Sequence, residues 1–362
     1  SVIPPEGMPF EEIDYENGTI LPGLVDCHVH LIGMGDGRAG DDLAALPDEV
    51  LVIQASKNAE AHLRSGVTTL RDCGAKNKTS FMLREAAKLG ITLTPELLLS
   101  GRPVAIIGGH LSYFGIQATG ENECRASVRQ LIKEGADFIK VTATGGSTRT
   151  SFPLLPSFNL EELTAITEEA RKFGVHTVAH CASSEGMTNA LDAGINTIVH
   201  AQFRDPDGST TFRPDIAEKM ARQNVYVNPT FHVMRTRIRA LESKLKADGL
   251  NEIEKDELDA AKRQDEQHVD CFRKLRDAGV TIVSGSDSSW GDYKMGAFQY
   301  EIEASVEAGM SAMEAIVSAT GDSAKSCWID DRSGTLEQVC TFRMSRSIRI
   351  QQGNVRSQGF GR

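Results

Sequence analysis

The chain of 362 residues lacks the features of a membrane or nucleic-acid-binding protein. No apolar run approaches the roughly 20 residues that span a bilayer. Positive charge is also scarce, since Lys and Arg total 39 against 50 Asp and Glu, a formal net charge of -11. Binding to phosphate backbones needs a clustered excess of positive charge. We therefore expect no membrane and no nucleic-acid partner, and a small-molecule substrate.

Cysteine pairs are missing as well. The seven cysteines are scattered and form no C-x-x-C pair, so the sequence predicts neither a disulfide framework nor a thiolate zinc site. This pattern favours a reducing compartment, and we expect a cytoplasmic protein. The opening stretch SVIPPEGMPFEE has no basic segment followed by an apolar core, so no signal peptide is predicted. The absence of an initiator Met leaves a removed leader open.

What the sequence does contain is a recurring unit of a helical stretch, a glycine and a short apolar strand, as in HLRSGVTTLRDCG and KLRDAGVTIVSGSDSS. Glycine suits the end of a helix, and the apolar run suits a strand covered on both faces. Eight such strands alternate with helices. The pattern predicts an α/β protein with a closed (β/α)8 TIM-like barrel, with an open doubly wound sheet as the alternative. A charged stretch at about 233–277 predicts a solvated helical hairpin.

Polar residues stand at the carboxyl ends of the predicted strands, where barrel enzymes place their catalytic groups. In the stretch DCHVH, His28 and His30 are two positions apart, so they share one face of a strand and can chelate a metal. Four further strand ends supply Lys140, His180, His200 and Asp287. Each alone has a simpler explanation, such as a hydrogen-bonded barrel histidine or a helix cap. Agreement between five strands favours a metal site.

Lys140 is unusual because its neighbours Phe138, Ile139 and Val141 are apolar. Burial of an unpaired ammonium group is costly, so such a group tends to lose its proton. A neutral amine can react with carbon dioxide to form a carbamate, which can bridge two metal ions. The alternative is a lysine that extends out of the barrel mouth to solvent.

Together these motifs resemble the amidohydrolase superfamily of metal-dependent hydrolases. The resemblance runs from about residue 19 to 337 and rests on LPGLVDCHVHL, GVTTLRD, FIKVTATGG, VAHC, IVHAQF and GSDSS. It implies two divalent metal ions, with zinc expected because the ligands are imidazole and carboxylate. The implied ligands are His28, His30 and Asp287 for one ion, His180 and His200 for the other, and Lys140, as a carbamate formed with carbon dioxide, bridging both.

Within the superfamily, GGH at 108–110 and KVTATGG are similar to dipeptidases and carboxypeptidases that act on Xaa-Pro, Xaa-Arg or Xaa-Lys bonds. The resemblance implies hydrolysis of an amide-type bond in a small dipeptide or N-acyl amino acid. Asp287 would carry a proton from the attacking water to the leaving group, and His110 would donate to the developing oxyanion and bind substrate. Arg149 is a candidate partner for a substrate carboxylate.

The sequence departs from this group at two places. Met234 stands where its members commonly have a tyrosine, so we expect weaker dependence on a free substrate carboxylate. Superfamily members also carry a small β-sandwich built from both chain ends, whose return segment begins at 334–337 and is then lost. We therefore divide the chain into an N-terminal sandwich remnant (1–18), the barrel (19–330), and a C-terminal sandwich remnant with a disordered basic tail (331–362).

Other functions remain compatible with the same barrel. Carbamate, urea or lactone hydrolysis would use the same metal centre. A mononuclear deaminase would need an acid three residues after His180, where the chain has Ser183. A barrel that only binds a ligand is the non-enzymatic alternative. A homo-oligomer is compatible with the sequence.

Overall fold

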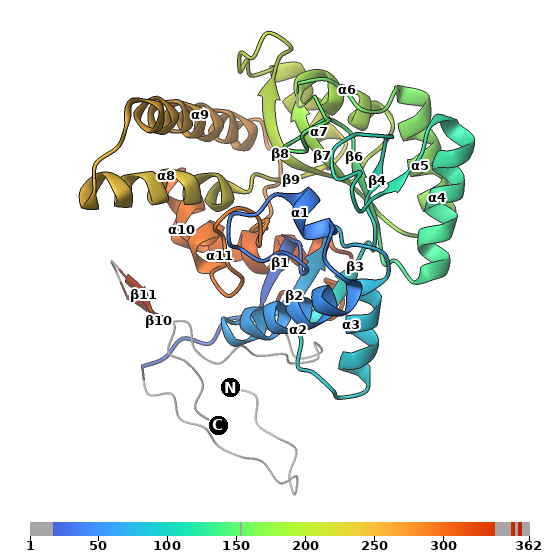
Figure 1. The fold of residues 1–362 in the computed structure, drawn as a ribbon, viewed down its shortest axis with the longest axis horizontal. Coiled ribbons are helices and arrows are strands. Elements are labelled where there is room, and N and C mark those ends of the chain that lie inside the picture. The colour runs from blue at the N-terminus through green and yellow to red at the C-terminus, as the bar shows by residue number, and fades with distance from the viewer. Residues whose placement is uncertain (1–16, 153, 337–348, 352–353, 357–362) are drawn as a thin grey trace, which may run out of the picture.

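The computed structural model describes residues 17–152, 154–336, 349–351 and 354–356. Strands lie at the centre of the molecule and helices surround them, as Figure 1 shows. Helices follow strands along most of the chain, and the strands of both central sheets are parallel. This confirms the predicted α/β class with parallel sheets.

The first sheet has the strand order β1-β2-β3. Its strands are β1 (Leu24–Val29), β2 (Val67–Asp72) and β3 (Glu96–Leu99). The helices of this part are α1 (Gly40–Ala44), α2 (Asp48–Arg64) and α3 (Thr79–Lys88). Every residue of β1 and β2 is buried, as expected for parallel strands that are covered on both faces.

The second sheet has the order β5-β4-β6-β7-β8-β9. Its strands are β4 (Val104–Ala105), β5 (Ile116–Gln117), β6 (Ile139–Thr142), β7 (Thr177–Ser183), β8 (Thr197–Arg204) and β9 (Tyr226–Asn228). The helices between these strands are α4 (Gly120–Glu134), α5 (Leu160–Lys172), α6 (Ser184–Asp192) and α7 (Pro214–Arg222). Apolar side chains from these helices and strands form the largest core cluster.

The chain after β9 is mainly helical. It contains α8 (Phe231–Ala247), α9 (Glu252–Asp277), α10 (Gln299–Glu307), α11 (Ala312–Val317), the π-helical turn η1 (Ser318–Asp322) and α12 (Ser323–Ser326). Helices α8 and α9 pack side by side, as the charged stretch predicts (Figure 1).

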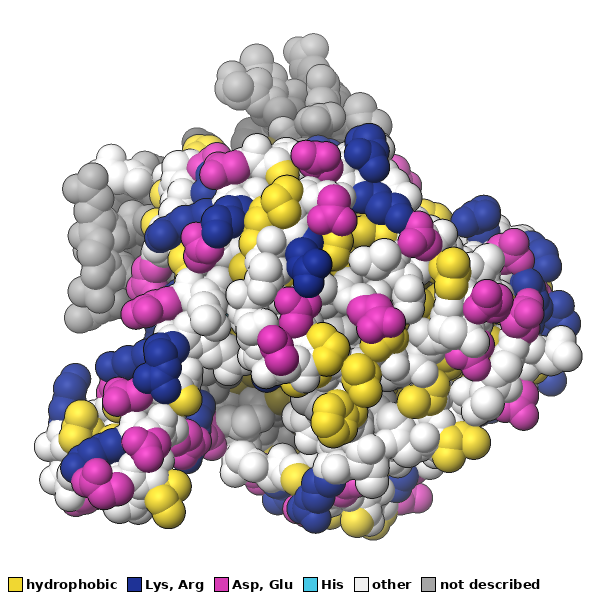
Figure 2. Space-filling view, turned by 90° about the horizontal axis from the view of Figure 1, so that it is seen from above, with side chains coloured by type: hydrophobic (Ala, Val, Ile, Leu, Met, Phe, Trp, Pro, Cys, Tyr) yellow, Lys and Arg dark blue, Asp and Glu magenta, His cyan; other side chains and the backbone are white. Residues whose placement is uncertain are grey.

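In the view of Figure 2, basic and acidic side chains are intermixed over the surface.

The segment 282–288 lies between the two sheets. It forms isolated parallel bridges from Ile282 to Val227 of β9 and from Ser288 to Val29 of β1. Backbone hydrogen bonds hold it against β1, since Asp287 N donates to His28 O at 2.7 Å and His30 N donates to Ser288 O at 2.5 Å. The described residues therefore form two parallel sheets joined by bridges. The predicted barrel does not occur in them as one continuous closed ladder.

The predicted chain-end regions lie mostly outside the described residues. In the C-terminal region, the structure describes only two short strands after residue 336, β10 (Arg349–Gln351) and β11 (Asn354–Arg356), which pair in an antiparallel manner. The division into a barrel and two sandwich remnants therefore stays a prediction. In the described part of the chain, no helix combines the length and apolar character needed to cross a bilayer.

Candidate metal centre

The predicted site residues converge on one cavity of about 460 Å³ at the carboxyl ends of the strands. Its wall contains His28 and His30 from β1, Lys140 from β6, His180 from β7 and His200 from β8, together with the loop residues His110 and Asp287. Arg149 is exposed and is not among the residues that line this cavity. The structure therefore brings together seven predicted residues and leaves the eighth outside.

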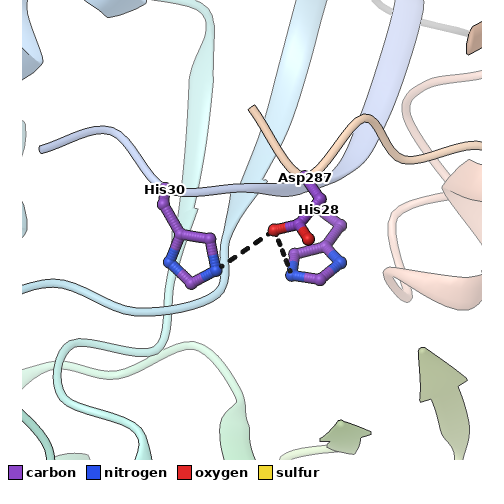
Figure 3. Close-up of side chains that lie close together, drawn as sticks. All are labelled: His28, His30 and Asp287. Carbon is purple, nitrogen blue, oxygen red and sulfur yellow. Dashed lines mark ion pairs between the residues drawn. The ribbon is translucent and has the colours of Figure 1, made fainter. Parts of the chain in front are cut away.

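His28, His30 and Asp287 form the tightest cluster (Figure 3). One ligand atom from each of the three residues lies within 4.8 Å of the others. Oδ1 of Asp287 lies 3.4 Å from Nε2 of His28 and 3.5 Å from Nε2 of His30. The cluster depends on the backbone contact between β1 and 284–288, because the carboxylate comes from a segment far away in the sequence.

The hydrogen bonds at Nδ1 of His28 and His30 determine which nitrogen of each ring keeps its lone pair. Nδ1 of His30 lies 3.0 Å from the carbonyl oxygen of Gly74, which only accepts, so Nδ1 carries the proton. Nδ1 of His28 lies 3.2 Å from Oδ1 of Asn228. The Asn228 amide nitrogen donates to the carbonyls of Val283 and Gly285, which orients its oxygen toward His28.

Both Nε2 lone pairs therefore face the carboxylate of Asp287. Three electron-rich atoms at this spacing repel one another unless a proton or a metal cation lies between them. Hydrogen bonds from metal-ligating histidines to carbonyl and carboxamide oxygens are typical of metal sites, where they set the tautomer and the ring orientation. The donor set of His28, His30 and Asp287 thus fits a divalent cation.

In His180 and His200, too, one ring nitrogen is hydrogen-bonded and the other keeps its lone pair. Nε2 of His180 lies 2.9 Å from the carbonyl oxygen of Gly145, so its lone pair is on Nδ1. Nδ1 of His200 lies 2.7 Å from Oγ1 of Thr230, and that hydroxyl donates to the carbonyl of Pro229, so it accepts from His200. The ring centroids of His180 and His200 are 4.7 Å apart. Two further imidazoles are therefore free to bind a second cation.

Burial sets the protonation of the cavity groups. It lowers the pKa of His30 and of His180 to about 3, and it lowers the pKa of His28 and His200 as well. All four imidazoles are therefore neutral at pH 7, which is the form that binds metal. Burial raises the pKa of Asp287 to about 7, while the charge of Lys140 opposes this shift.

Lys140 is 1% exposed, so its side chain does not reach solvent. Its Nζ lies 3.4 Å from Nε2 of His28, and the described residues provide no ion-pair partner for it. Burial lowers the pKa of Lys140, which favours the neutral amine.

His110 lines the cavity from the loop between β4 and β5. Its Nδ1 lies 3.1 Å from Oγ1 of Thr148, and its ring centroid lies 4.4 Å from that of His180. Burial lowers the pKa of His110, so its ring is neutral and can offer one N–H. This position suits a hydrogen-bond donor to a substrate oxygen.

Sequence reasoning missed Arg204, which lines the cavity at the end of β8. A signal was present in the sequence, because regular alternation along a strand would place Gln202 and Arg204 on the face of His200. The strand itself is irregular here, since His200, Ala201 and Phe203 have positive φ angles. His200, Gln202 and Arg204 are all cavity residues.

Asp26 holds the two segments of the tight cluster together. Its Oδ1 accepts from the backbone N–H groups of His28 (3.2 Å) and Ser286 (2.9 Å). Its Oδ2 accepts from Nε2 of His62 (2.9 Å) and Oγ of Ser286 (2.5 Å). The other ring nitrogen of His62 accepts from Gly296 N, so His62 is neutral and donates to Asp26. One buried carboxylate thus links β1, α2 and the segment that carries Asp287.

Residues 19–338 match the Amidohydrolase family, and the chain belongs to this family. Its curated relatives include ochratoxinase of Aspergillus niger, 27% identical over 331 residues, a match that covers 84% of this chain and 64% of that protein. The chain thus spans somewhat less than two thirds of that relative.

Two solved structures extend the comparison. An Xaa-Pro dipeptidase with bound methionine in the active site is 30% identical, with a TM-score of 0.73 over 91% of this chain and 82% of that chain. A prolidase complexed with N-methylphosphonate-L-proline has a TM-score of 0.76 over 93% of this chain and 82% of that chain. At 24% identity, the second likeness shows a shared fold.

We predict that Asp26→Asn destabilises the protein by about 2–3 kcal/mol, because the amide removes hydrogen bonds to a charged group and turns an N–H₂ toward existing donors. Asp72 is the matched control, since it is equally buried but its Oδ2 has no partner in the described structure. Urea unfolding followed by circular dichroism measures both variants.

The control has its own pH dependence. Burial raises the pKa of Asp72 from 3.8 to about 7, so between these values the folded state holds a proton that the unfolded state has lost. Wild-type stability therefore falls as pH rises through this window, and Asp72→Asn escapes the loss. The stability of Asp72→Asn relative to wild type should rise from pH 4 to pH 7. Equal losses for the two variants at pH 8 would contradict the role of Asp26.

Proposed function

We propose that this protein is a metal-dependent hydrolase that cleaves an amide-type bond in a small dipeptide or N-acyl amino acid. The observation that carries the proposal is the set of four neutral histidines, each with one nitrogen hydrogen-bonded to a group outside the metal site. Their other nitrogens lie in one cavity with Asp287 and Lys140. Membership of the Amidohydrolase family and the likeness to an Xaa-Pro dipeptidase support it.

The cavity fits two divalent ions, with zinc as the expected metal. His28, His30 and Asp287 would hold one ion, and His180 and His200 the other. When bound, such ions supply Lewis acidity and lower the pKa of a bound water to near 7. We also infer that the two sheets, joined through segment 282–288, are the two parts of one (β/α)8 barrel. The bridges to β9 and β1 support this inference.

Lys140 would bridge the two ions as a carbamate. Its neutral amine forms a C–N bond with carbon dioxide and releases one proton, which leaves one negative charge on the carbamate oxygens. Burial, the lowered pKa and the absence of an ion-pair partner among the described residues all favour this reaction over a free ammonium group.

The remaining steps belong to Asp287 and His110. Asp287 would take the proton of the attacking water and pass it to the leaving nitrogen. His110 would donate its N–H to the substrate oxygen as negative charge develops there. The deaminase alternative lacks a proton carrier at Ser183, whose hydroxyl instead caps α6 by accepting from Gly186 N.

A substrate panel on zinc-replete protein tests the reaction class. Dipeptides and N-acyl amino acids should be hydrolysed, whereas turnover restricted to carbamates, ureas or lactones would select those alternatives. We also propose a cytoplasmic location, supported by the six cysteines of the described chain, which are all buried free thiols.

For the metal centre we predict about two zinc ions per chain after growth with zinc and bicarbonate. Lys140→Met keeps the volume but cannot form a carbamate, so it should lower zinc affinity at least about tenfold and abolish its dependence on bicarbonate. Isotope-labelled bicarbonate should give a carbamate carbon signal in NMR spectra of wild type only. Lys133→Met, at an exposed lysine of α4, is the control. Unchanged zinc binding in Lys140→Met would refute the bridge.

For the oxyanion contact we predict that His110→Asn lowers kcat about 10²- to 10³-fold without loss of zinc, because His110 is a donor and not a ligand. His176→Asn, at a buried histidine outside the cavity wall, should retain kcat. Elemental analysis and initial rates measure the two effects. Loss of zinc in His110→Asn would assign the residue to the metal instead.

A further inference from the structure

One wall of the cavity contains a cation that the proposed metal chemistry does not use. Arg204 ends β8 and lines the cavity beside Gln202 of the same strand, Met234 of α8 and Gln264 of α9. Its side chain is half-buried. Arg204 is therefore the one charged residue among these four, since Gln202, Met234 and Gln264 are neutral.

The charge of Arg204 is not compensated by the protein. Within the described residues its guanidinium has no ion-pair or hydrogen-bond partner. The neighbouring acid is already engaged, because Asp205 accepts from the guanidinium of Arg213 at 3.1 Å. The backbone is held as well, since Asp205 N donates to Ser209 O at 2.9 Å and Arg204 bridges Thr210.

The other charged groups of the cavity do not face Arg204 as partners. Asp287 lies against His28 and His30, and the amine of Lys140 lies against His28. The wall also contains the amide of Gln264, which likewise has no hydrogen-bond partner in the described structure. A guanidinium with free N–H groups in a concave site suits the two oxygens of a carboxylate, which it binds in a bidentate manner.

We propose that Arg204 is a specificity-determining residue that binds a free carboxylate of the substrate. This proposal rests on the proposed function and narrows it to amides that carry a carboxylate, such as dipeptides with a free C-terminus and N-acyl amino acids. Arg204 takes the role that the sequence suggested for Arg149. It also reverses the expectation, drawn from Met234, that activity depends only weakly on a free substrate carboxylate. The sulfur of Met234 accepts a hydrogen bond from the Gln202 amide at 3.5 Å.

A kinetic comparison tests the proposal. Xaa-Pro and Xaa-Arg dipeptides are assayed beside their C-terminal amides in wild type, Arg204→Gln, Arg204→Lys and Arg149→Gln. Wild type should prefer the free acid by about 10- to 100-fold in kcat/KM, the range expected for a contact to a charged group. In Arg204→Gln, kcat/KM for the free acid should fall about 10- to 100-fold further than kcat/KM for the amide, so that the preference is lost. Arg204→Lys should restore part of it.

Arg149→Gln is the matched control, because Arg149 is exposed and lies outside the cavity wall. This variant should keep the full preference for the free acid. A preference that survives in Arg204→Gln, or that is lost in Arg149→Gln, would overturn the assignment.

Ligand binding separates this proposal from the reaction itself. Calorimetry with N-acetyl-L-proline and its amide needs no turnover, and wild type should bind the acid about tenfold or more tightly, a difference absent in Arg204→Gln. Failure of every substrate in the panel, with this binding difference intact, would reject amide hydrolysis and leave the carboxylate site standing. Equal binding of acid and amide by wild type would reject the carboxylate site alone.

Discussion

The contact between β1 and segment 284–288 is the constraint on which the site depends. Asp26 accepts hydrogen bonds from both segments, and backbone bonds at His28 and His30 hold them in register. The packing at this contact is close, because a Cβ on Gly285 would lie 2.8 Å from the backbone nitrogen of His28. Without this contact, the carboxylate of Asp287 would not meet the two histidines of β1.

Electrostatics then decides what the cavity can hold. Burial keeps the imidazoles neutral, and carbonyl, carboxamide and hydroxyl partners occupy one nitrogen of each ring. The remaining lone pairs and a buried carboxylate make the cavity electron-rich, while Lys140 gains by losing its charge. A cavity of this kind is stabilised by cations, and the proposed role of Arg204 at its edge is to bind the anionic group of a substrate.

The sequence predicted which residues line the cavity better than it predicted the groups that orient them. Strand ends were readable because apolar runs and glycines mark each unit, so the amino-acid pattern alone placed His28, His180 and His200 at strand ends. Partners such as Gly74 and Gly145 contribute backbone carbonyls, which have no signature in the sequence. Arg149 was chosen for its position in a polar loop, yet the loop directs it to solvent. Arg204 was missed although regular alternation along a strand would place it on the face of His200.

Histidine tautomers in the metal-free protein test the central claim most directly. Long-range proton–nitrogen NMR correlations distinguish the two tautomers of each neutral ring, and single His→Gln variants assign the signals. We expect the proton on Nδ1 of His28, His30 and His200 and on Nε2 of His180, so that the signals of the opposite nitrogens move away from their free-base shifts when zinc is added. The reverse tautomers, or shifts that zinc leaves unchanged, would contradict a metal centre prepared by its surrounding hydrogen bonds.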